Sequence, residues 1–186
     1  MAVNRGKTFE DVIKDAFERV PDTSVVRLHD QTTGYLGSSN HCDFIVYRKP
    51  YEYHIECKSV HGNTLSIHSI PKPDKHGVLH GFYGNITDTQ WNGLVEKSKI
   101  EGVVAGVICW WIDKDVTAFI PIWYLDYIKR NHPEVKSINV NLMLKESEEL
   151  EKYIDFKNPH FIQIKGKKKR VFFDYAMKEF LEEVSK

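Results

Sequence analysis

Two neighbouring segments, 43–48 and 52–59, constrain the fold of this chain more than any other part of its sequence. A short turn at Pro50 separates them, and in the second segment the charged residues Glu56 and Lys58 alternate with apolar ones. Successive side chains of a strand point to opposite faces of a sheet. The pattern therefore predicts two adjacent strands with one face packed against a core and the other face polar.

The rest of the chain alternates between helical and extended patterns. Apolar residues at helical spacing predict amphipathic helices, and the first of them has Thr8 as its cap and Pro21 as its stop. Helices are expected at 9–20, at 87–102, around 124–130 and from about Asp174 onward. Apolar runs predict strands at 24–29, 103–112 and 116–122. A stretch rich in proline and glycine predicts a long surface loop at 71–85. This order of elements indicates one α/β domain over residues 1–186.

Composition excludes several classes of protein. A hydrophobic content of 41% is too high for a disordered or collagen-like chain. The longest apolar run, 103–112, is far shorter than the roughly 20 residues of a membrane span, and residues 1–7 have no apolar stretch that could serve as a signal core. The 3 cysteines have no C-x-x-C spacing, which favours neither a disulfide framework nor a cysteine zinc site. We therefore expect a soluble protein in a reducing, cytoplasmic compartment, with no membrane partner.

A group of polar side chains near the predicted sheet forms the candidate site. Asp43 begins the first strand of the hairpin, and pairing with the second strand brings its carboxylate close to Glu56. Adjacent carboxylates are costly unless a cation lies between them. Glu10 is also unusual, because it lies about 20° from Phe17 on a helical wheel, at the edge of the face that packs inward. Gln90 is a second polar side chain of this kind, because it lies close to the inward face of the second predicted helix.

This set of residues suits hydrolysis of a phosphodiester. Carboxylates can hold Mg²⁺ or Mn²⁺, the metal lowers the pKa of a bound water, and Lys58 orients that water or stabilises the transition state. Taken singly, the same residues have simpler explanations, namely a solvated strand edge, a turn acid, an acid at a helix end and a surface amide. Their combination favours the nuclease site.

Basic charge is concentrated near the C-terminus, although 26 Lys and Arg balance 26 Asp and Glu over the whole chain. Residues 157–170 carry six basic side chains and no acidic one. A localised basic face suits contacts with backbone phosphates. The residues expected to make such contacts are Lys165, Lys167, Lys168, Lys169 and Arg170.

The histidines do not form a recognisable metal motif. There are 9 of them, and their spacing matches no zinc template, so most are predicted to be solvated loop residues. His54 is the exception, because strand alternation places it on the same face as Glu56.

Several short motifs resemble those of known nucleases. The order of Asp43, then Glu56-Cys57-Lys58 on the next strand, resembles the motif of the PD-(D/E)xK nuclease superfamily. The N-R-G-x-x-x-E start of the first helix, residues 4–10, is similar to that of the RecU family of Holliday junction resolvases. Further similarities to that family are SSNHCD at 38–43, IECK at 55–58, Gln90 and GVI at 106–108. Together these motifs cover most of residues 4–122.

The resemblance implies a restriction-endonuclease-like core, in which a central mixed β-sheet is flanked by helices. It also implies a homodimeric, Mg²⁺- or Mn²⁺-dependent endonuclease that resolves four-way junctions in branched DNA during recombination and repair. Position by position, it implies metal ligands Asp43 and Glu56, an outer metal-site or water-coordinating acid Glu10, a catalytic lysine Lys58, an active-site amide Gln90, and a substrate contact Arg5. Lys7, which lies close to Arg5 in the chain, is a further expected DNA contact.

The chain departs from the family pattern in two places. Cys42 stands where the superfamily motif has proline, at a position that shapes the strand without adding chemistry. Segment 30–41 is too short for the projecting stalk of RecU proteins, so the chain resembles a compact phage-type relative, which would act in the cytoplasm of a bacterial host. Two other functions stay open, namely a nuclease for other DNA, such as flaps or a specific duplex sequence, and a non-catalytic DNA-binding recombination factor.

Overall fold

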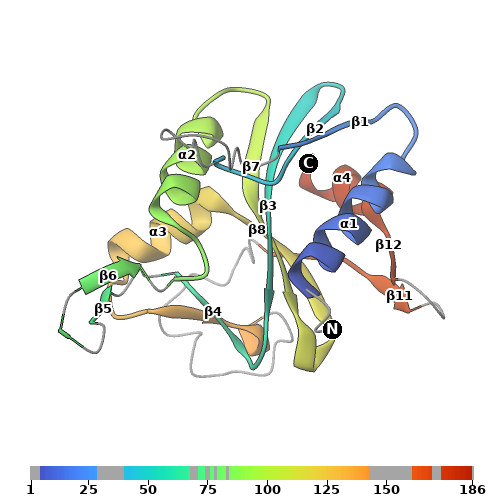
Figure 1. Ribbon diagram of the computed structural model, residues 1–186. Helices are drawn as coiled ribbons and strands as arrows, with labels where there is room; N and C mark the ends of the chain where they lie inside the picture. Colours follow the sequence, from blue (N-terminus) through green and yellow to red (C-terminus); the bar gives the residue numbers. More distant parts are fainter. Residues whose placement is uncertain are drawn as a thin grey trace.

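A mixed sheet of six strands forms the centre of the protein (Figure 1). The computed structural model describes residues 5–28, 40–67, 71–73, 76–77, 79–82, 84–142, 161–168 and 173–185. In spatial order the strands are β1 (Ser24–Arg27), β2 (Phe44–Arg48), β3 (Tyr51–Val60), β7 (Val103–Trp111), β8 (Val116–Pro121) and β10 (Ile162–Gln163). The central strands β3 and β7 run parallel, and every other neighbouring pair in this sheet is antiparallel.

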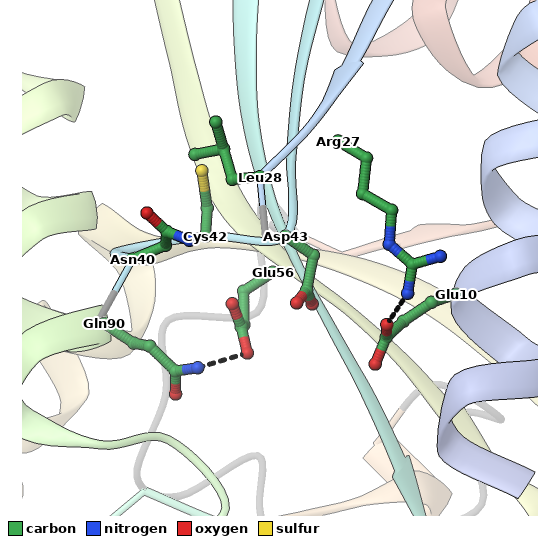
Figure 2. A pocket seen from close by; sticks show the side chains of 8 residues that line it. All are labelled: Glu10, Arg27, Leu28, Asn40, Cys42, Asp43, Glu56 and Gln90. Carbon is green, nitrogen blue, oxygen red and sulfur yellow. Dashed lines mark hydrogen bonds and ion pairs between the residues drawn. The ribbon is translucent and has the colours of Figure 1, made fainter. Parts of the chain in front are cut away.

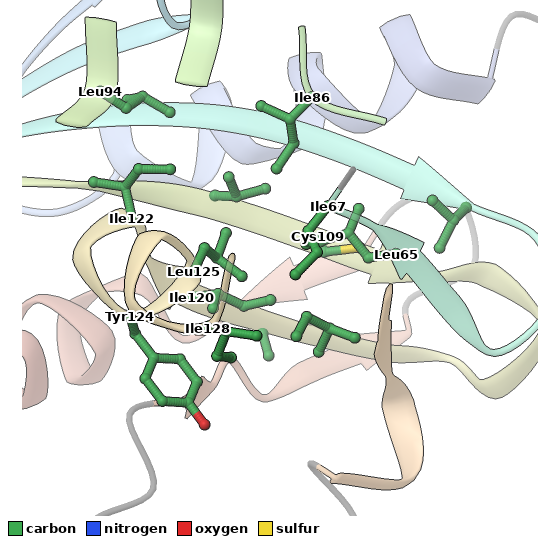
Figure 3. Packing of buried hydrophobic residues seen from close by; sticks show 14 of the residues in the cluster. Leu65, Ile67, Ile86, Leu94, Cys109, Ile120, Ile122, Tyr124, Leu125 and Ile128 are labelled. Carbon is green, nitrogen blue, oxygen red and sulfur yellow. The ribbon is translucent and has the colours of Figure 1, made fainter. Parts of the chain in front are cut away.

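Helices cover both faces of this sheet, with α1 and α4 on one face and α2 and α3 on the other (Figure 1). Their bounds are α1 (Arg5–Glu18), α2 (Asp88–Ser98), α3 (Ile122–Asn131) and α4 (Met177–Val184). Adjacent residues of β7 belong to different cores, because Ile108 packs with Phe17 on the α1 side, whereas Val107 packs with Leu94 and Leu125 on the other side. Figure 3 shows the packing in this second core. The sheet therefore separates two apolar cores.

Three short antiparallel pairs lie outside the central sheet. They are β4 (Thr64–Ser66) with β9 (Ser137–Asn139), β5 (Pro71–Pro73) with β6 (Leu79–Phe82), and β11 (Gly166–Lys168) with β12 (Phe173–Tyr175). Two single 3₁₀ turns, Ile112–Lys114 and Val140–Leu142, complete the regular structure of the described residues. Among those residues, no helix is both long and apolar enough to cross a membrane.

The α/β class with a central mixed sheet between helices is confirmed, and the hairpin of β2 and β3 forms as the alternation predicts. The predicted cap of the first helix is wrong, because the helix begins at Arg5 and Thr8 lies inside it. Arg and Lys are good helix formers, so the preceding residues extend the helix without a cap at Thr8. The expected end of the second helix at Gly102 is also too late, since α2 ends at Ser98.

Two further predictions of local structure are wrong. Residues 71–85 are not all loop, since Pro71–Pro73 and Leu79–Phe82 pair as β5 and β6. A two-stranded ribbon has only edge strands, where proline is tolerated. The last helix begins at Met177 instead of near Asp174, because Asp174 lies in β12 and pairs with Lys167 of β11.

The close contact between β7 and β8 at Gly106 gives a test of the packing. A Cβ atom on Gly106 would lie 2.5 Å from the carbonyl oxygen of Ile120 and 2.6 Å from the ring of Phe119. We expect Gly106→Ala to lower the free energy of unfolding by about 1–3 kcal/mol, because the extra methyl group overpacks the core. Thermal unfolding followed by circular dichroism measures the change. The exposed Thr64→Ala is the control and should change stability by less than about 0.5 kcal/mol, and equal melting temperatures for Gly106→Ala and wild type would contradict the packing.

Candidate active site

Asp43 is held at the start of β2 by the backbone of β3. Its backbone N–H donates to the carbonyl oxygen of Ile55 at 3.0 Å, which continues the β2–β3 ladder by one residue. Its side chain also has a backbone partner, since the N–H of Cys57 donates to Asp43 Oδ2 at 2.7 Å. The carboxylate is therefore fixed beside β3 through Oδ2, and Oδ1 takes no part in this bond.

Glu56 lies in the middle of β3, and its side chain is only 2% exposed. Its Oε1 atom accepts a hydrogen bond of 2.6 Å from Gln90 Nε2 (Figure 2). The same oxygen lies 2.7 Å from Lys58 Nζ. Lys58 Nζ also donates to Gln90 Oε1 at 3.2 Å, which closes a triangle of three side chains. The second carboxylate oxygen, Glu56 Oε2, is buried and has no hydrogen-bond partner in the part of the chain that the structure describes.

Glu10 approaches the same region from helix α1. Its Oε2 atom pairs with the guanidinium of Arg27 at the end of β1 (Figure 2). Arg27 also pairs with Asp11 through a contact of 2.6 Å between Nη1 and Oδ1. The guanidinium therefore links α1 to β1 and holds the Glu10 carboxylate at the wall of the site.

These acids converge on one cavity of about 210 Å³. Figure 2 shows the carboxyl groups of Glu10, Asp43 and Glu56 directed toward a common space. The complete lining is Glu10, Arg27, Leu28, Asn40, Cys42, Asp43, Glu56 and Gln90. Three carboxyl groups around a single cavity create a local concentration of negative charge.

Burial and mutual repulsion make two of these carboxyl groups reluctant to ionise. Burial raises the pKa of Asp43 to about 6, and the charge of Glu10 adds to the rise, whereas the Cys57 N–H opposes it. Burial likewise raises the pKa of Glu56 to about 8, with a contribution from Asp43, although Lys58 acts in the opposite direction. A cation in the cavity would favour the ionised form of both groups.

The donor set fits a hard divalent cation. Mg²⁺ and Mn²⁺ prefer oxygen ligands, and Asp43 and Glu56 present carboxylate oxygens to the cavity. Glu56 Oε2 is a buried oxygen that has no other partner among the described residues, so it is available as a ligand. Glu10 is engaged with Arg27, which suits an outer position at the site more than direct coordination.

The structure brings together all five side chains that the sequence singles out for chemistry, namely Glu10, Asp43, Glu56, Lys58 and Gln90. Sequence reasoning missed Arg27, which pairs with Glu10 and lines the cavity. The only indication in the sequence was that Arg27 is a single cation in the predicted strand 24–29, which precedes the hairpin. Its partner could not be inferred without the pairing of β1 with β2.

The predicted DNA contacts that the structure describes lie at two places in the fold, in helix α1 and in or next to β11. Arg5 and Lys7 are in the first turn of α1, and Lys165 is exposed. Lys167 and Lys168 belong to β11. The predictions that fall outside the described residues concern Asn4, segment 30–39, Lys157, Lys169 and Arg170.

Comparison of the chain with protein-family models and with curated proteins gives no match. The resemblance to RecU-type resolvases therefore stays a prediction based on the short motifs. The side chains around the cavity are an independent basis for assigning a function.

The burial of Glu56 predicts how the stability of the metal-free protein depends on pH. Its folded pKa of about 8 lies above the ordinary value of a glutamate, so its contribution to stability is full below that ordinary value and is lost as pH rises through the folded pKa. We expect the melting temperature of the wild type to fall between about pH 5 and pH 9, and Glu56→Gln to remove much of this fall. Thermal melts in a chelator across this range measure both.

Glu96→Gln is the matched control for this measurement, because Glu96 is an exposed acid that pairs with Lys99 on the surface of α2. It should keep the pH dependence of the wild type. The same decline in Glu56→Gln as in the wild type would show that Glu56 is not the group responsible. Adding Mg²⁺ at about pH 8 should raise the melting temperature of the wild type more than that of Glu56→Gln.

Proposed function

We propose that this protein is a metal-dependent endonuclease that hydrolyses phosphodiester bonds in branched DNA, with four-way junctions as its substrate. The observation that carries the proposal is the buried Glu56, which has one oxygen without a described partner and lines the same cavity as Asp43. A carboxylate in this environment destabilises the metal-free fold. Its presence is explained if the site binds a cation and performs chemistry.

Asp43 and Glu56 would hold Mg²⁺ or Mn²⁺, and Glu10 would act as the outer acid of the site. A bound metal of this kind supplies an activated water at neutral pH and offsets negative charge on the scissile phosphate. The protein contributes positioning, because Asp43 is fixed by the Cys57 N–H and Glu56 by Lys58 and Gln90.

Lys58 is the residue best placed to act on the reacting phosphate. Its ammonium group is partly exposed, with 20% of the side chain accessible, whereas its partner Glu56 is buried. The hydrogen bond to Gln90 restricts the ammonium to one side of the site. A positive charge fixed in this way can orient the attacking water or stabilise the charge that develops on the phosphate oxygens.

The branched substrate and the homodimer are supported by the RecU-like motifs, and so is a restriction-endonuclease-like arrangement of the mixed sheet. Two active sites in a dimer would allow both strands of a junction to be cut symmetrically. The exposed Lys165 belongs to the basic segment that would contact backbone phosphates. Segment 30–41 is too short for a stalk, so selectivity among branched substrates is part of the test.

Loss of either proposed metal ligand should abolish cleavage. We expect Asp43→Asn and Glu56→Gln to cut a labelled four-way junction too slowly to detect in Mg²⁺, while junction affinity in a gel-shift assay changes little. Both substitutions keep the shape of the side chain and remove the charge that holds the metal. Glu96→Gln, which changes an exposed acid, should cleave at the wild-type rate.

The same assay separates the proposed function from its alternatives. Four-way, three-way, flap and linear duplex substrates are compared at equal concentration with the wild type. Preferred cleavage of flaps or of one duplex sequence would replace the junction assignment but keep the nuclease site. Wild-type cleavage by Glu56→Gln would contradict the site itself, and binding without cleavage in both Mg²⁺ and Mn²⁺ would indicate a non-catalytic factor.

Replacement of the lysine tests its electrostatic role. We expect Lys58→Met to lower the cleavage rate by a factor of about 10²–10³, since it removes one group that stabilises developing charge and leaves the carboxylates in place. Single-turnover cleavage at saturating protein measures the effect separately from binding. Lys99→Met, which removes an exposed lysine from the end of α2, should leave the rate unchanged. A rate for Lys58→Met within about twofold of the wild type would exclude a catalytic lysine at this position.

A further inference from the structure

His41, Cys42 and His54 form a second cluster of possible metal ligands. It borders the site of the three carboxylates, since Cys42 also lines their cavity. His41 Nε2 lies 2.8 Å from His54 Nδ1, and Cys42 Sγ lies 3.9 Å from the same nitrogen. The three atoms all lie within 4.8 Å of one another. Cys42 is 2% exposed and His54 is 1% exposed, so two of the three potential ligands are almost completely buried.

A carboxylate on the far side of the His54 ring orients this ring for metal coordination. Its Nε2 atom lies 2.7 Å from Glu52 Oε1. An ionised carboxylate only accepts hydrogen bonds, so Nε2 carries the ring proton and Nδ1 presents its lone pair toward His41 and Cys42. A carboxylate bound to the distal nitrogen of a histidine is the usual outer partner of a metal-binding imidazole.

The backbone around the cluster is also fixed. The ladder of β2 and β3 continues to the N–H of Asp43, which keeps Cys42 beside β3. His41 packs against helix α2 at Gly93, where a Cβ atom would collide with the His41 side chain. Absence of a side chain at Gly93 therefore allows the close approach that brings His41 to His54.

We propose that His41 Nε2, Cys42 Sγ and His54 Nδ1 bind Zn²⁺. Imidazole nitrogen and thiolate sulfur are the ligands that Zn²⁺ prefers, whereas Mg²⁺ prefers oxygen. In a tetrahedral zinc site the ligand atoms lie about 3.3–3.6 Å apart, which follows from Zn–N and Zn–S distances of about 2.0–2.3 Å. The contacts of 2.8 and 3.9 Å from His54 Nδ1 bracket this spacing. A small outward movement of the partly exposed His41 ring would lengthen the first contact, and a small rotation of the Cys42 side chain would shorten the second.

Coordination would cross-link the chain before β2 to the middle of β3. The thiol proton of Cys42 would leave to solvent when its sulfur binds the metal. Three protein ligands leave the fourth position for a water molecule or another ligand. The zinc site does not depend on the proposed nuclease activity, because its ligands are distinct from Asp43 and Glu56.

Titration of the reduced, metal-free full chain with Co²⁺ tests the proposal by absorption spectroscopy, since Co²⁺ replaces Zn²⁺ in sites of this kind and reports its ligands. We expect a thiolate-to-cobalt charge-transfer band in the near ultraviolet, intense visible bands typical of tetrahedral Co²⁺, and loss of both when Zn²⁺ is added. Cys42→Ala should lose the charge-transfer band. Glu52→Gln should keep the band and weaken Zn²⁺ binding by about 10- to 100-fold.

Two variants serve as controls. Cys109→Ala removes another buried cysteine, and Asp43→Asn removes a carboxylate of the neighbouring cavity, so both should retain the charge-transfer band. Circular dichroism verifies that each variant is folded. Absence of the band in folded wild-type protein would overturn the proposal, and so would its persistence in Cys42→Ala. Retention of junction cleavage in either case would leave the nuclease assignment intact, so that the two proposals can fail separately.

Discussion

The candidate site on the central sheet depends on the interaction between buried Glu56 and its two partners, Lys58 and Gln90. Removing a carboxylate from water costs several kcal/mol, and an ion pair and a hydrogen bond offset this only in part. Burial accordingly raises the pKa of Glu56 to about 8 in spite of the charge of Lys58, so the charged form is disfavoured at neutral pH. A chain that needed only stability would place an apolar residue here, as it does at Ile55. The retained carboxylate is therefore best explained by chemistry.

Strand β3 presents apolar side chains to one face of the sheet and possible metal ligands to the other. Tyr53, Ile55 and Cys57 belong to the apolar core under α1 and α4. The intervening side chains point toward the α2 face, where His54 lies in the nitrogen and sulfur cluster and Glu56 lies in the oxygen-rich cavity. Two sets of ligands with different chemical preference therefore lie two residues apart on one strand. The 2-residue period of the strand places His54 and Glu56 on the same face, opposite the core under α1 and α4.

The sequence was informative where local periodicity determines direction, and much less so where contacts depend on register. Alternation along 52–59 was enough to predict that Glu56 and Lys58 share a face, and the helical wheel identified Glu10. The cluster of His41 with His54 could not be predicted in the same way, because it requires the pairing of Phe44 with Ile55 across the hairpin. A shift of one residue in that register would turn every facing side chain to the opposite side. The ribbon of β5 and β6 was missed for a related reason, since its prolines suppress the strand signal although edge strands tolerate them.

Gln90 shows why an amide, and not an acid, occupies the third position of helix α2. Its Oε1 atom accepts from the N–H of Thr87 at 3.0 Å and from Lys58 Nζ at 3.2 Å, while its Nε2 atom donates to Glu56 Oε1 at 2.6 Å. Glutamate also occurs at this position of the capping box and would likewise accept from the N–H of Thr87. It has no donor for Glu56, however, and its charge would repel a carboxylate that burial already destabilises. Only an amide of this length can cap the helix, accept from Lys58 and donate to Glu56 at once, so the start of α2 and the geometry of the candidate site are fixed by the same side chain.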